Sequence, residues 1–277
     1  MALKTLHEVI SSVDAEKRGV GMFNVVGVEY AEAIIQAAEE ENFPVMLGFP
    51  GSFFAFHPKP VHVVNMMLDM AASATVPVVV HLDHGANYDV VMQALRWGFS
   101  SVMFDGSSLP FEENIRQTAE IARVAHSMGA SIEGELGYLG FGENVVILED
   151  NLTKPEQAAE YVERTQVDAL AVAIGNIHGH YKGTPHLDLE RLAAIRKATN
   201  NCALVLHGGS GLSTEDFQNA ILGGVRKVNI FTNMNDVAGA CITRLLAEKK
   251  PWHMVAKEMQ VEVKDLLRTL IHTFARL

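Results

Sequence analysis

The sequence predicts an α/β fold in which eight strand-helix units close into a (β/α)₈ TIM barrel, with extra helices at the C-terminus. Short apolar runs rich in β-branched residues recur along the chain, and their continuous pattern indicates parallel strands buried on both faces. Amphipathic segments with helical spacing separate the runs. Eight such units within about 240 residues suit a closed barrel, and a doubly wound open sheet is the alternative.

Each element is predicted from its own stretch of residues. The expected strands lie at 20–25, 44–49, 77–83, 100–105, 131–136, 168–174, 203–207 and 226–231. The expected helices lie at 29–41, 60–74, 87–97, 112–128, 155–165, 188–199 and 214–223. Asp188 and Ser213 stand where a side-chain oxygen can cap a helix, and Gly98 stands where a helix ends.

Length and composition indicate one globular domain over residues 1–277. Its helical extension, at about 235–277, is expected to pack in a dimer or to cover the site. Hydrophobic residues make up 48% and charged residues 20% of the chain, which is ordinary for a folded domain. The net charge of −11 disfavours nucleic acid and anionic membranes as partners, so a phosphate must be captured in a local pocket.

The chain carries no recognisable targeting pattern. It starts with a helical pattern rather than a secretory one, and no apolar run reaches the ~20 residues of a membrane helix. Cys202 and Cys241 are the only cysteines, too few for a disulfide framework. We therefore expect a cytoplasmic protein.

Polar residues stand in or just past nearly every apolar run. In a barrel enzyme, the reacting groups come from the C-terminal ends of several strands. The residues that the sequence places there are Asn24, Asp83, His84, Asp105, Glu133, Glu135, His178, His207, Asn229 and Thr232.

Three of these residues are histidines that can converge on one metal ion. Neutral imidazole is a favoured zinc ligand, and catalytic zinc typically keeps three protein ligands and an open position. A single histidine is more often a packed or solvated side chain. His84, His178 and His207, however, each stand beside glycine, in HLDHG, IHGH and LHGGSG, where a ligand can approach the backbone. The pattern favours a metal site.

The stretch LHGGSG also predicts a phosphate site. Its consecutive glycines leave N–H groups free to face an anion, and Ser210 adds a hydroxyl. Glycine turns are common, so the motif alone is a weak signal. Its place after the seventh strand, next to NIFT after the eighth, is where barrels frequently hold phosphate.

Carboxylates surround the proposed metal ligands. Asp83 is costly to bury alone, so it is either a proton carrier or a partner that orients a histidine. Asp105, Glu133 and Glu135 allow a second cation or a hydrogen-bond network. No lysine is expected at a strand centre to form a Schiff base, although Lys227 precedes the eighth strand.

Taken together, the stretches HLDHG, FDGSSLPFEENI, IEGELG, AIGNIHGHYKG, VLHGGSG and KVNIFT resemble class II fructose-bisphosphate and tagatose-bisphosphate aldolases. The resemblance runs from about residue 3 to 245. It implies the same eight-stranded barrel and a homodimer or homotetramer. It also implies an enzyme that cleaves a ketose (bis)phosphate reversibly into dihydroxyacetone phosphate and an aldehyde, through a zinc-stabilised enediolate.

The resemblance assigns roles to individual residues. Zn²⁺ would be held by His84, His178 and His207, with Asp105 and Glu135 where the family places secondary cation ligands. Asp83 would exchange a proton with the aldehyde or alcohol oxygen, and Glu143, in the loop YLGFGENVV, would handle the C3 proton. A monovalent cation, Na⁺ or K⁺, would bind the carbonyls of Gly179 and Gly208. The residues expected to bind substrate are Asn24, Gly179, Lys182, Gly208, Gly209, Ser210, Asn229, Ile230, Phe231 and Thr232.

Because of two departures from the family pattern, the sequence does not determine which sugar phosphate is the substrate. Phe231 stands where relatives carry a small or acidic residue, and Asn233 replaces a usual acidic residue. Arg268 and Arg276 are candidates for binding a distal phosphate. The competing hypotheses are a zinc-dependent hydrolase, which would share the three histidines, and a non-catalytic partner subunit of another aldolase.

Overall fold

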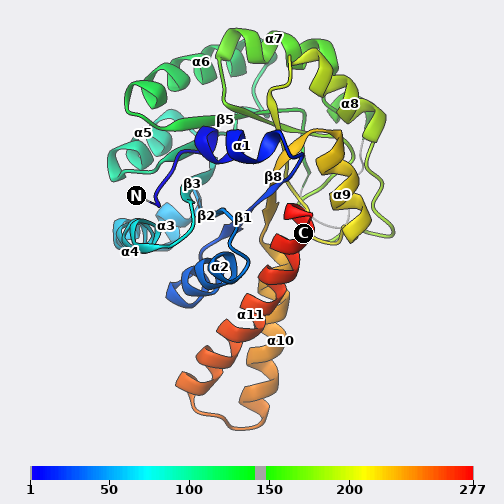
Figure 1. The fold of residues 1–277 in the computed structure, drawn as a ribbon. Helices are drawn as coiled ribbons and strands as arrows, with labels where there is room; N and C mark the ends of the chain where they lie inside the picture. Colours follow the sequence, from blue (N-terminus) through cyan, green and yellow to red (C-terminus); the bar gives the residue numbers. More distant parts are fainter. Residues whose placement is uncertain (1, 141–147, 277) are drawn as a thin grey trace.

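The computed structural model describes residues 2–140 and 148–276, and its centre is a closed barrel of eight parallel strands (Figure 1). The strands pair in chain order, and β1 pairs with β8 to close the ring. This closure confirms the barrel and excludes the open sheet. The strands are β1 (Val20–Asn24), β2 (Val45–Pro50), β3 (Val78–Gly85), β4 (Ser101–Phe104), β5 (Ser131–Leu136), β6 (Ala169–Val172), β7 (Ala203–Leu206) and β8 (Val225–Ile230).

Helices surround the barrel and bury their apolar faces against it (Figure 1). Asp188 and Ser213 cap their helices as predicted, each accepting a hydrogen bond from a backbone N–H of the first turn. The helices up to the eighth strand are α1 (Leu6–Asp14), α2 (Val28–Glu40), α3 (Phe53–Phe56), α4 (Pro60–Ser73), α5 (Tyr88–Trp97), α6 (Phe111–Ser127), the 3₁₀ turn η1 (Glu149–Asn151), α7 (Pro155–Thr165), α8 (Leu189–Ala198) and α9 (Thr214–Gly223).

The first helix closes the N-terminal end of the barrel. The backbone of Lys4 donates to the carbonyl of Val78, at the start of β3, over 2.8 Å. At the other end of α1, the carboxylate of Asp14 binds the guanidinium groups of Arg196, at 2.9 Å, and Arg226. The opposite end, where the strands finish, is left for a site.

Two long helices, α10 (Thr232–Ala247) and α11 (Trp252–Ala275), form a hairpin that projects from the barrel (Figure 1). Its last turns return to the barrel, where the carbonyl of Phe274 accepts from the backbone of Gly19 at 2.9 Å. Gly19 precedes β1, so α11 ends at the N-terminal end of the barrel and its last turns do not cover the rim formed by the strand ends. Trp252, at the tip of the hairpin, is 62% exposed.

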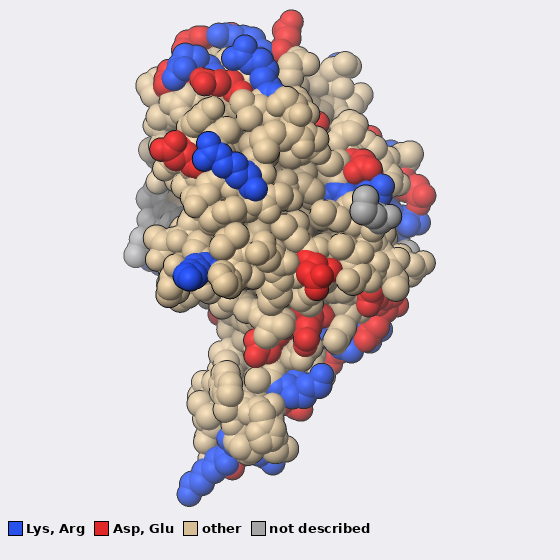
Figure 2. All heavy atoms as spheres, turned by 90° about the vertical axis from the view of Figure 1, so that its left-hand side faces the viewer, with Lys and Arg blue, Asp and Glu red and all other residues tan. Residues whose placement is uncertain are grey.

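The surface shows mixed charges and no sign of a membrane-spanning helix. On the face shown in Figure 2, acidic and basic side chains alternate with broad uncharged areas, without a continuous basic tract. Among residues 2–140 and 148–276, no helix combines the length and apolar character needed to cross a bilayer.

Candidate active site

One pocket at the C-terminal ends of the strands gathers most of the predicted site residues. Every strand except β2 contributes at least one of them, directly or from the loop that follows it. The predicted residues that line it are Asn24, Asp83, His84, Asp105, Glu135, His178, Gly179, His207, Gly208, Ser210, Asn229, Ile230, Phe231 and Thr232.

Two of the described residues that were predicted to bind substrate, Gly209 and Lys182, are not among those that line this pocket. Gly209 lies directly behind it, where an added Cβ would be 3.0 Å from Ile230 and from Phe217. Lys182 is exposed on the loop after β6, so its binding role stays a prediction. Glu143 lies outside the described residues.

The three histidines point ring nitrogens at one another. Nε2 of His84 lies 3.1 Å from Nε2 of His178 and 3.1 Å from Nδ1 of His207. A tetrahedral zinc ion with ligands at about 2.0–2.1 Å would hold such nitrogens about 3.3 Å apart. The spacing of the three rings therefore fits a single metal ion.

The protonation states of the rings also suit a cation. Burial and then the charge of His84 lower the pKa of His178 to about 4, and the same two effects hold the pKa of His207 well below its usual range. These two rings therefore keep lone pairs for a metal. Burial would lower the pKa of His84, but Asp83, Asp105 and Glu135 outweigh it and raise the pKa to about 10. Carboxylates that favour an imidazolium here would also favour a bound metal cation.

Carboxylates behind two of the histidines set their orientation. Glu133 contacts Nε2 of His207 at 2.8 Å, and Asp105 contacts Nδ1 of His84 at 2.9 Å. In each case the other ring nitrogen faces the cluster, as is usual when a carboxylate orients a metal-ligating histidine.

Glu135 belongs to a second group that can hold a cation, together with His84 and Asp105. Its Oε2 lies 4.0 Å from Nδ1 of His84. Burial, followed by the charge of Asp105, raises the pKa of Glu135 to about 8. Because a second positive charge would relieve the crowding of these two carboxylates, the arrangement suits either a cation or a shared proton.

A bulge in β3 brings two consecutive residues to the same pocket. Successive side chains of a strand normally point to opposite faces. The pairing of β3 with β4 shifts between Leu82 and Gly85, and His84 has a φ of 49°, in the left-handed region. Bulges of this kind re-aim side chains next to active sites. Asp83 and His84 therefore both line the pocket.

Two amides hold the carboxylate of Asp83. Asn24 donates to Oδ2 at 2.9 Å and Asn229 donates to Oδ1 at 3.0 Å. Burial would raise the pKa of Asp83, but the charges of His84, His207 and Lys227 lower it. An ionised, fixed carboxylate thus lies beside the three histidines.

Lys227 lies within β8 and is fully buried. The expectation that no lysine stands at a strand centre, with Lys227 before the eighth strand, was therefore wrong. Its ammonium lies 2.9 Å from Oε2 of Glu133 and donates to Oδ1 of Asn229 at 2.7 Å. Lys227 is not among the residues that line the pocket. An amine engaged in an ion pair beneath the pocket is unsuited to Schiff-base chemistry.

The loops after β7 and β8 have the features of the predicted anion site. Gly208 has a φ of 65°, and a Cβ there would meet the carbonyl of Ile177 at 1.9 Å, so only glycine fits. The backbone N–H of Asn233 donates to the hydroxyl of Ser210 at 3.4 Å. This N–H belongs to the first turn of α10, whose N–H groups lack intrahelical acceptors. Glycine turns and a helix N-terminus together attract a phosphate.

Two positioning residues were missed in the sequence. Asn176 donates to the carbonyl of His207 at 2.9 Å and accepts from the backbone of Ile174 at 2.8 Å. Tyr181 donates its hydroxyl to the carbonyl of Gly208 at 2.9 Å. Both residues fall within AIGNIHGHYKG, and they tie the loop after β6 to the loop after β7. This stretch was identified in the sequence as part of the family resemblance. These two side chains could not be identified there, because their contacts between the loops depend on the fold.

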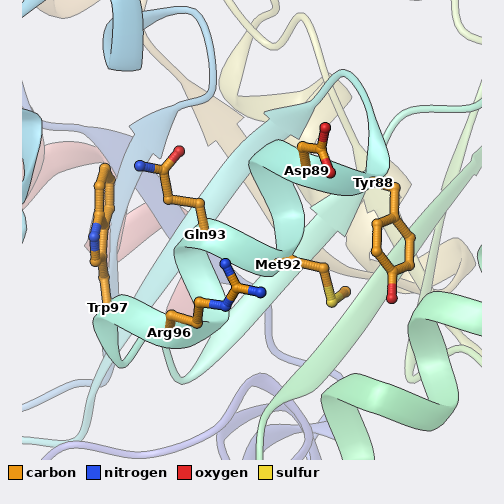
Figure 3. A pocket seen from close by; sticks show the side chains of 6 residues that line it. All are labelled: Tyr88, Asp89, Met92, Gln93, Arg96 and Trp97. Carbon is orange, nitrogen blue, oxygen red and sulfur yellow. The ribbon is translucent and has the colours of Figure 1, made fainter.

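A second hollow lies on the outside of the barrel and is formed by α5 alone (Figure 3). Its side chains are spread along the helix rather than gathered around one point. It offers no cluster comparable to the histidines at the rim. The residues that line it are Tyr88, Asp89, Met92, Gln93, Arg96 and Trp97.

Comparisons with known proteins agree with this geometry. A family model described as fructose-bisphosphate aldolase class-II matches residues 4–276. A probable fructose-bisphosphate aldolase of Bacillus subtilis (strain 168) is 39% identical over 255 residues, covering 91% of this chain and 88% of the relative. The fructose-bisphosphate aldolase of Geobacillus stearothermophilus is 41% identical over 256 residues, with the same coverage.

Solved structures give the same result. The crystal structure of the YdjI aldolase from Escherichia coli K12 is similar with a TM-score of 0.89 and 36% identity, and the match covers 98% of this chain and 97% of that one. A putative fructose-1,6-biphosphate aldolase from Coccidioides immitis matches with a TM-score of 0.90 and 29% identity, over 98% and 96% of the two chains. The sequence, the barrel and the histidine cluster thus agree, and the chain belongs to the class II fructose-bisphosphate aldolase family.

Proposed function

We propose that this chain is a zinc-dependent aldolase that reversibly cleaves a ketose phosphate into dihydroxyacetone phosphate and an aldehyde. The observation that carries the proposal is one pocket that combines a three-histidine cluster, a fixed carboxylate and an anion site. The relatives named as fructose-bisphosphate aldolases support the reaction class. The hydrolase hypothesis explains the histidines but gives no role to the anion site.

His84, His178 and His207 would hold the metal. When bound, Zn²⁺ supplies Lewis-acid polarisation of the ketone carbonyl. Gly208 and Ser210, with the N-terminus of α10, would bind the phosphate of the dihydroxyacetone fragment. This anchor would fix the C3–C4 bond beside Asp83.

Asp83 is proposed to move the proton of the C4 oxygen. In cleavage its carboxylate takes the proton from the C4 hydroxyl, the C3–C4 bond breaks, and the bonding electron pair stays on C3. Asn24 and Asn229 keep the carboxylate aimed during this transfer. Glu143, outside the described residues, is proposed to return a proton to C3. Condensation runs the same steps backwards.

Asp105 and Glu135 are proposed to hold a second cation together with His84. A monovalent cation at the carbonyls of Gly179 and Gly208 would share the Gly208 oxygen with the hydroxyl of Tyr181, and a carbonyl has two lone pairs to offer. A homodimer or homotetramer and a cytoplasmic location stay predictions.

Proton exchange at C3 of dihydroxyacetone phosphate tests the proposal without requiring the aldehyde to be known. The zinc-loaded protein should exchange this proton with D₂O, which NMR detects. Removal of the metal with a chelator should abolish the exchange, and added Zn²⁺ should restore it. Metal analysis verifies that the chelator has removed all of the zinc. Proton exchange that continues undiminished in this zinc-free protein would contradict the proposal.

A further inference from the structure

An aromatic wall, formed by Phe53 and Phe231, stands on one side of the pocket. Phe53 follows β2 and Phe231 follows β8, and β1 lies between these strands in the barrel. Their ring centroids are 6.2 Å apart, at an interplanar angle of 69°. Both residues line the pocket, as does Asn24 at the end of β1. The wall therefore stands over β1, beside Asp83.

The wall is supported from behind. Phe53 packs edge-on against Phe49, with centroids 5.7 Å apart and an angle of 85°. Phe49 is completely buried in β2. Offset and edge-to-face contacts of this kind are the favoured arrangements of aromatic rings. The packing against Phe49 thus holds the wall in a defined position as an apolar surface of the pocket.

The described part of this chain places no basic side chain in the pocket for a second phosphate. Among the described residues that line it, none is lysine or arginine. Residues 141–147 read FGENVVI, which also lacks both. Arg268 lies on the outer surface, where Nε is 3.1 Å from Glu40 and 2.9 Å from Glu41. It belongs to α11, which ends at the opposite end of the barrel.

The opposite side of the pocket is no better suited to an anion. This side is formed by β5 and the loops after β4 and β5, whose described residues contribute the carboxylates of Asp105 and Glu135, two serines and two apolar or aromatic side chains, with no cation among them. The hydroxyl of one serine, Ser107, is already engaged with Asp105 at 2.7 Å. The residues are Asp105, Ser107, Ser108, Glu135, Tyr138 and Leu139. Phosphate is usually bound by charge-assisted hydrogen bonds, most often from arginine. An unpaired dianion against phenylalanine rings or carboxylates would lose its hydration without compensation. The single anion site after β7 and β8 is sufficient for only one phosphate.

We propose that the aldehyde taken by this enzyme carries no phosphate and that its carbon chain lies against Phe53 and Phe231. The ketose would then be a 1-phosphate rather than a bisphosphate. In condensation, C3 of dihydroxyacetone phosphate loses a proton, and the electron pair left behind forms the bond to the aldehyde carbon. The aldehyde oxygen takes up a proton, so no further reactant is needed. This inference rests on the proposed function.

The first experiment compares two aldehydes that differ only in a phosphate. Wild-type enzyme is assayed for condensation of dihydroxyacetone phosphate with D-glyceraldehyde and with D-glyceraldehyde 3-phosphate. We expect kcat/KM to be about ten-fold or more higher for the unphosphorylated aldehyde, because a buried charge without a partner is strongly rejected. A preference for the phosphorylated aldehyde would overturn the inference.

A second experiment places a cation in the wall. Phe231→Arg should raise the ratio of kcat/KM for phosphorylated over unphosphorylated aldehyde by about ten-fold or more, since guanidinium binds phosphate directly. The control is Met128→Arg at the end of α6, because Met128 is 51% exposed, lies before β5 at the opposite end of the barrel, and does not line the pocket. The control should leave the ratio unchanged. An unchanged ratio in Phe231→Arg, with a normal thermal unfolding curve, would show that Phe231 does not face the aldehyde.

Proton exchange in the wild type separates the two levels of the proposal. Exchange at C3 with a preference for phosphorylated aldehydes would leave the proposed function intact and refute only the inference about the aldehyde. Absence of exchange in the zinc-loaded protein would refute the proposed function and the inference with it.

Discussion

At the residue scale, the pocket depends on side chains whose roles follow from their surroundings. The glycine contexts of His84, His178 and His207, together with the family resemblance, predicted that these side chains meet, and the structure brings them together. The joint presence of Asp83 and His84 was not predictable from strand periodicity, because it requires the bulge and the positive φ of His84. Lys227 was expected to precede the eighth strand, because the ion pair that holds its ammonium inside the barrel is made with Glu133, which is distant in sequence.

Asp83→Ala tests whether Asp83 transfers a proton while the three histidines bind the metal. Turnover should fall about 10²–10⁴-fold, the usual scale for loss of a general acid-base group. Metal content, measured by mass spectrometry, should stay that of the wild type because the histidines remain. His84→Ala is the comparison that should lose metal. Loss of metal from Asp83→Ala would mean that this carboxylate holds the histidine cluster together.

Lys227→Met should be strongly destabilising. It leaves the fully buried Glu133 without its cation, and breaking a buried ion pair from one side typically costs about 3–5 kcal/mol. Denaturant unfolding of the metal-free protein measures the loss. Lys227→Met combined with Glu133→Gln should recover part of it, because no unpaired charge then remains. Equal stability of the single variant and the wild type would argue against the pair.

At the scale of elements, the anion site arises where β8 passes directly into α10. Residues 226–231 were expected to form a strand and the extension to begin near 235, whereas β8 ends at Ile230 and α10 begins at Thr232. The sequence KVNIFTNM contains no glycine or proline to mark this boundary. The proposed phosphate site does not depend on this boundary, because its prediction follows from the barrel and from the glycines after β7.

Gly208→Ala should disable this anion site. The added methyl group would meet the carbonyl of Ile177, and the backbone has a positive φ that alanine tolerates poorly. The apparent KM for dihydroxyacetone phosphate should rise by about ten-fold or more, the effect of losing charge-assisted hydrogen bonds to phosphate. Gly239→Ala is the matched control, since nothing lies within 4 Å of its Cβ. That variant, within α10, should keep its KM and gain about 0.5–1 kcal/mol of stability.

At the scale of the whole molecule, the histidines join strands on opposite sides of the ring. His84 belongs to β3, whereas His178 and His207 follow β6 and β7. The closed barrel and its parallel order were predictable from the spacing of apolar runs. The direction of the C-terminal hairpin was not, because the amphipathic pattern of a helix does not say which neighbour it will meet.

Metal binding should therefore stabilise the entire fold. A ligand present at 100 times its Kd adds about 2.7 kcal/mol to the folded state, which raises the Tm of a chain of this size by several degrees. Thermal unfolding with Zn²⁺ and with a chelator measures the difference. His84→Ala should show no zinc-dependent shift, and a full shift in that variant would place the metal elsewhere.

The buried chain of contacts beneath the pocket has a consequence for the evolution of this protein. Lys227 is joined to His207 through Glu133 and to Asp83 through Asn229. A single replacement at positions 133, 227 or 229 leaves a buried charge or hydrogen-bonding group without its partner. Selection should then act on the residues at positions 133, 227 and 229 together rather than on each of them separately. Across related genomes, we expect these positions to be inherited together, and lineages that lose one of them to have replaced the others as well.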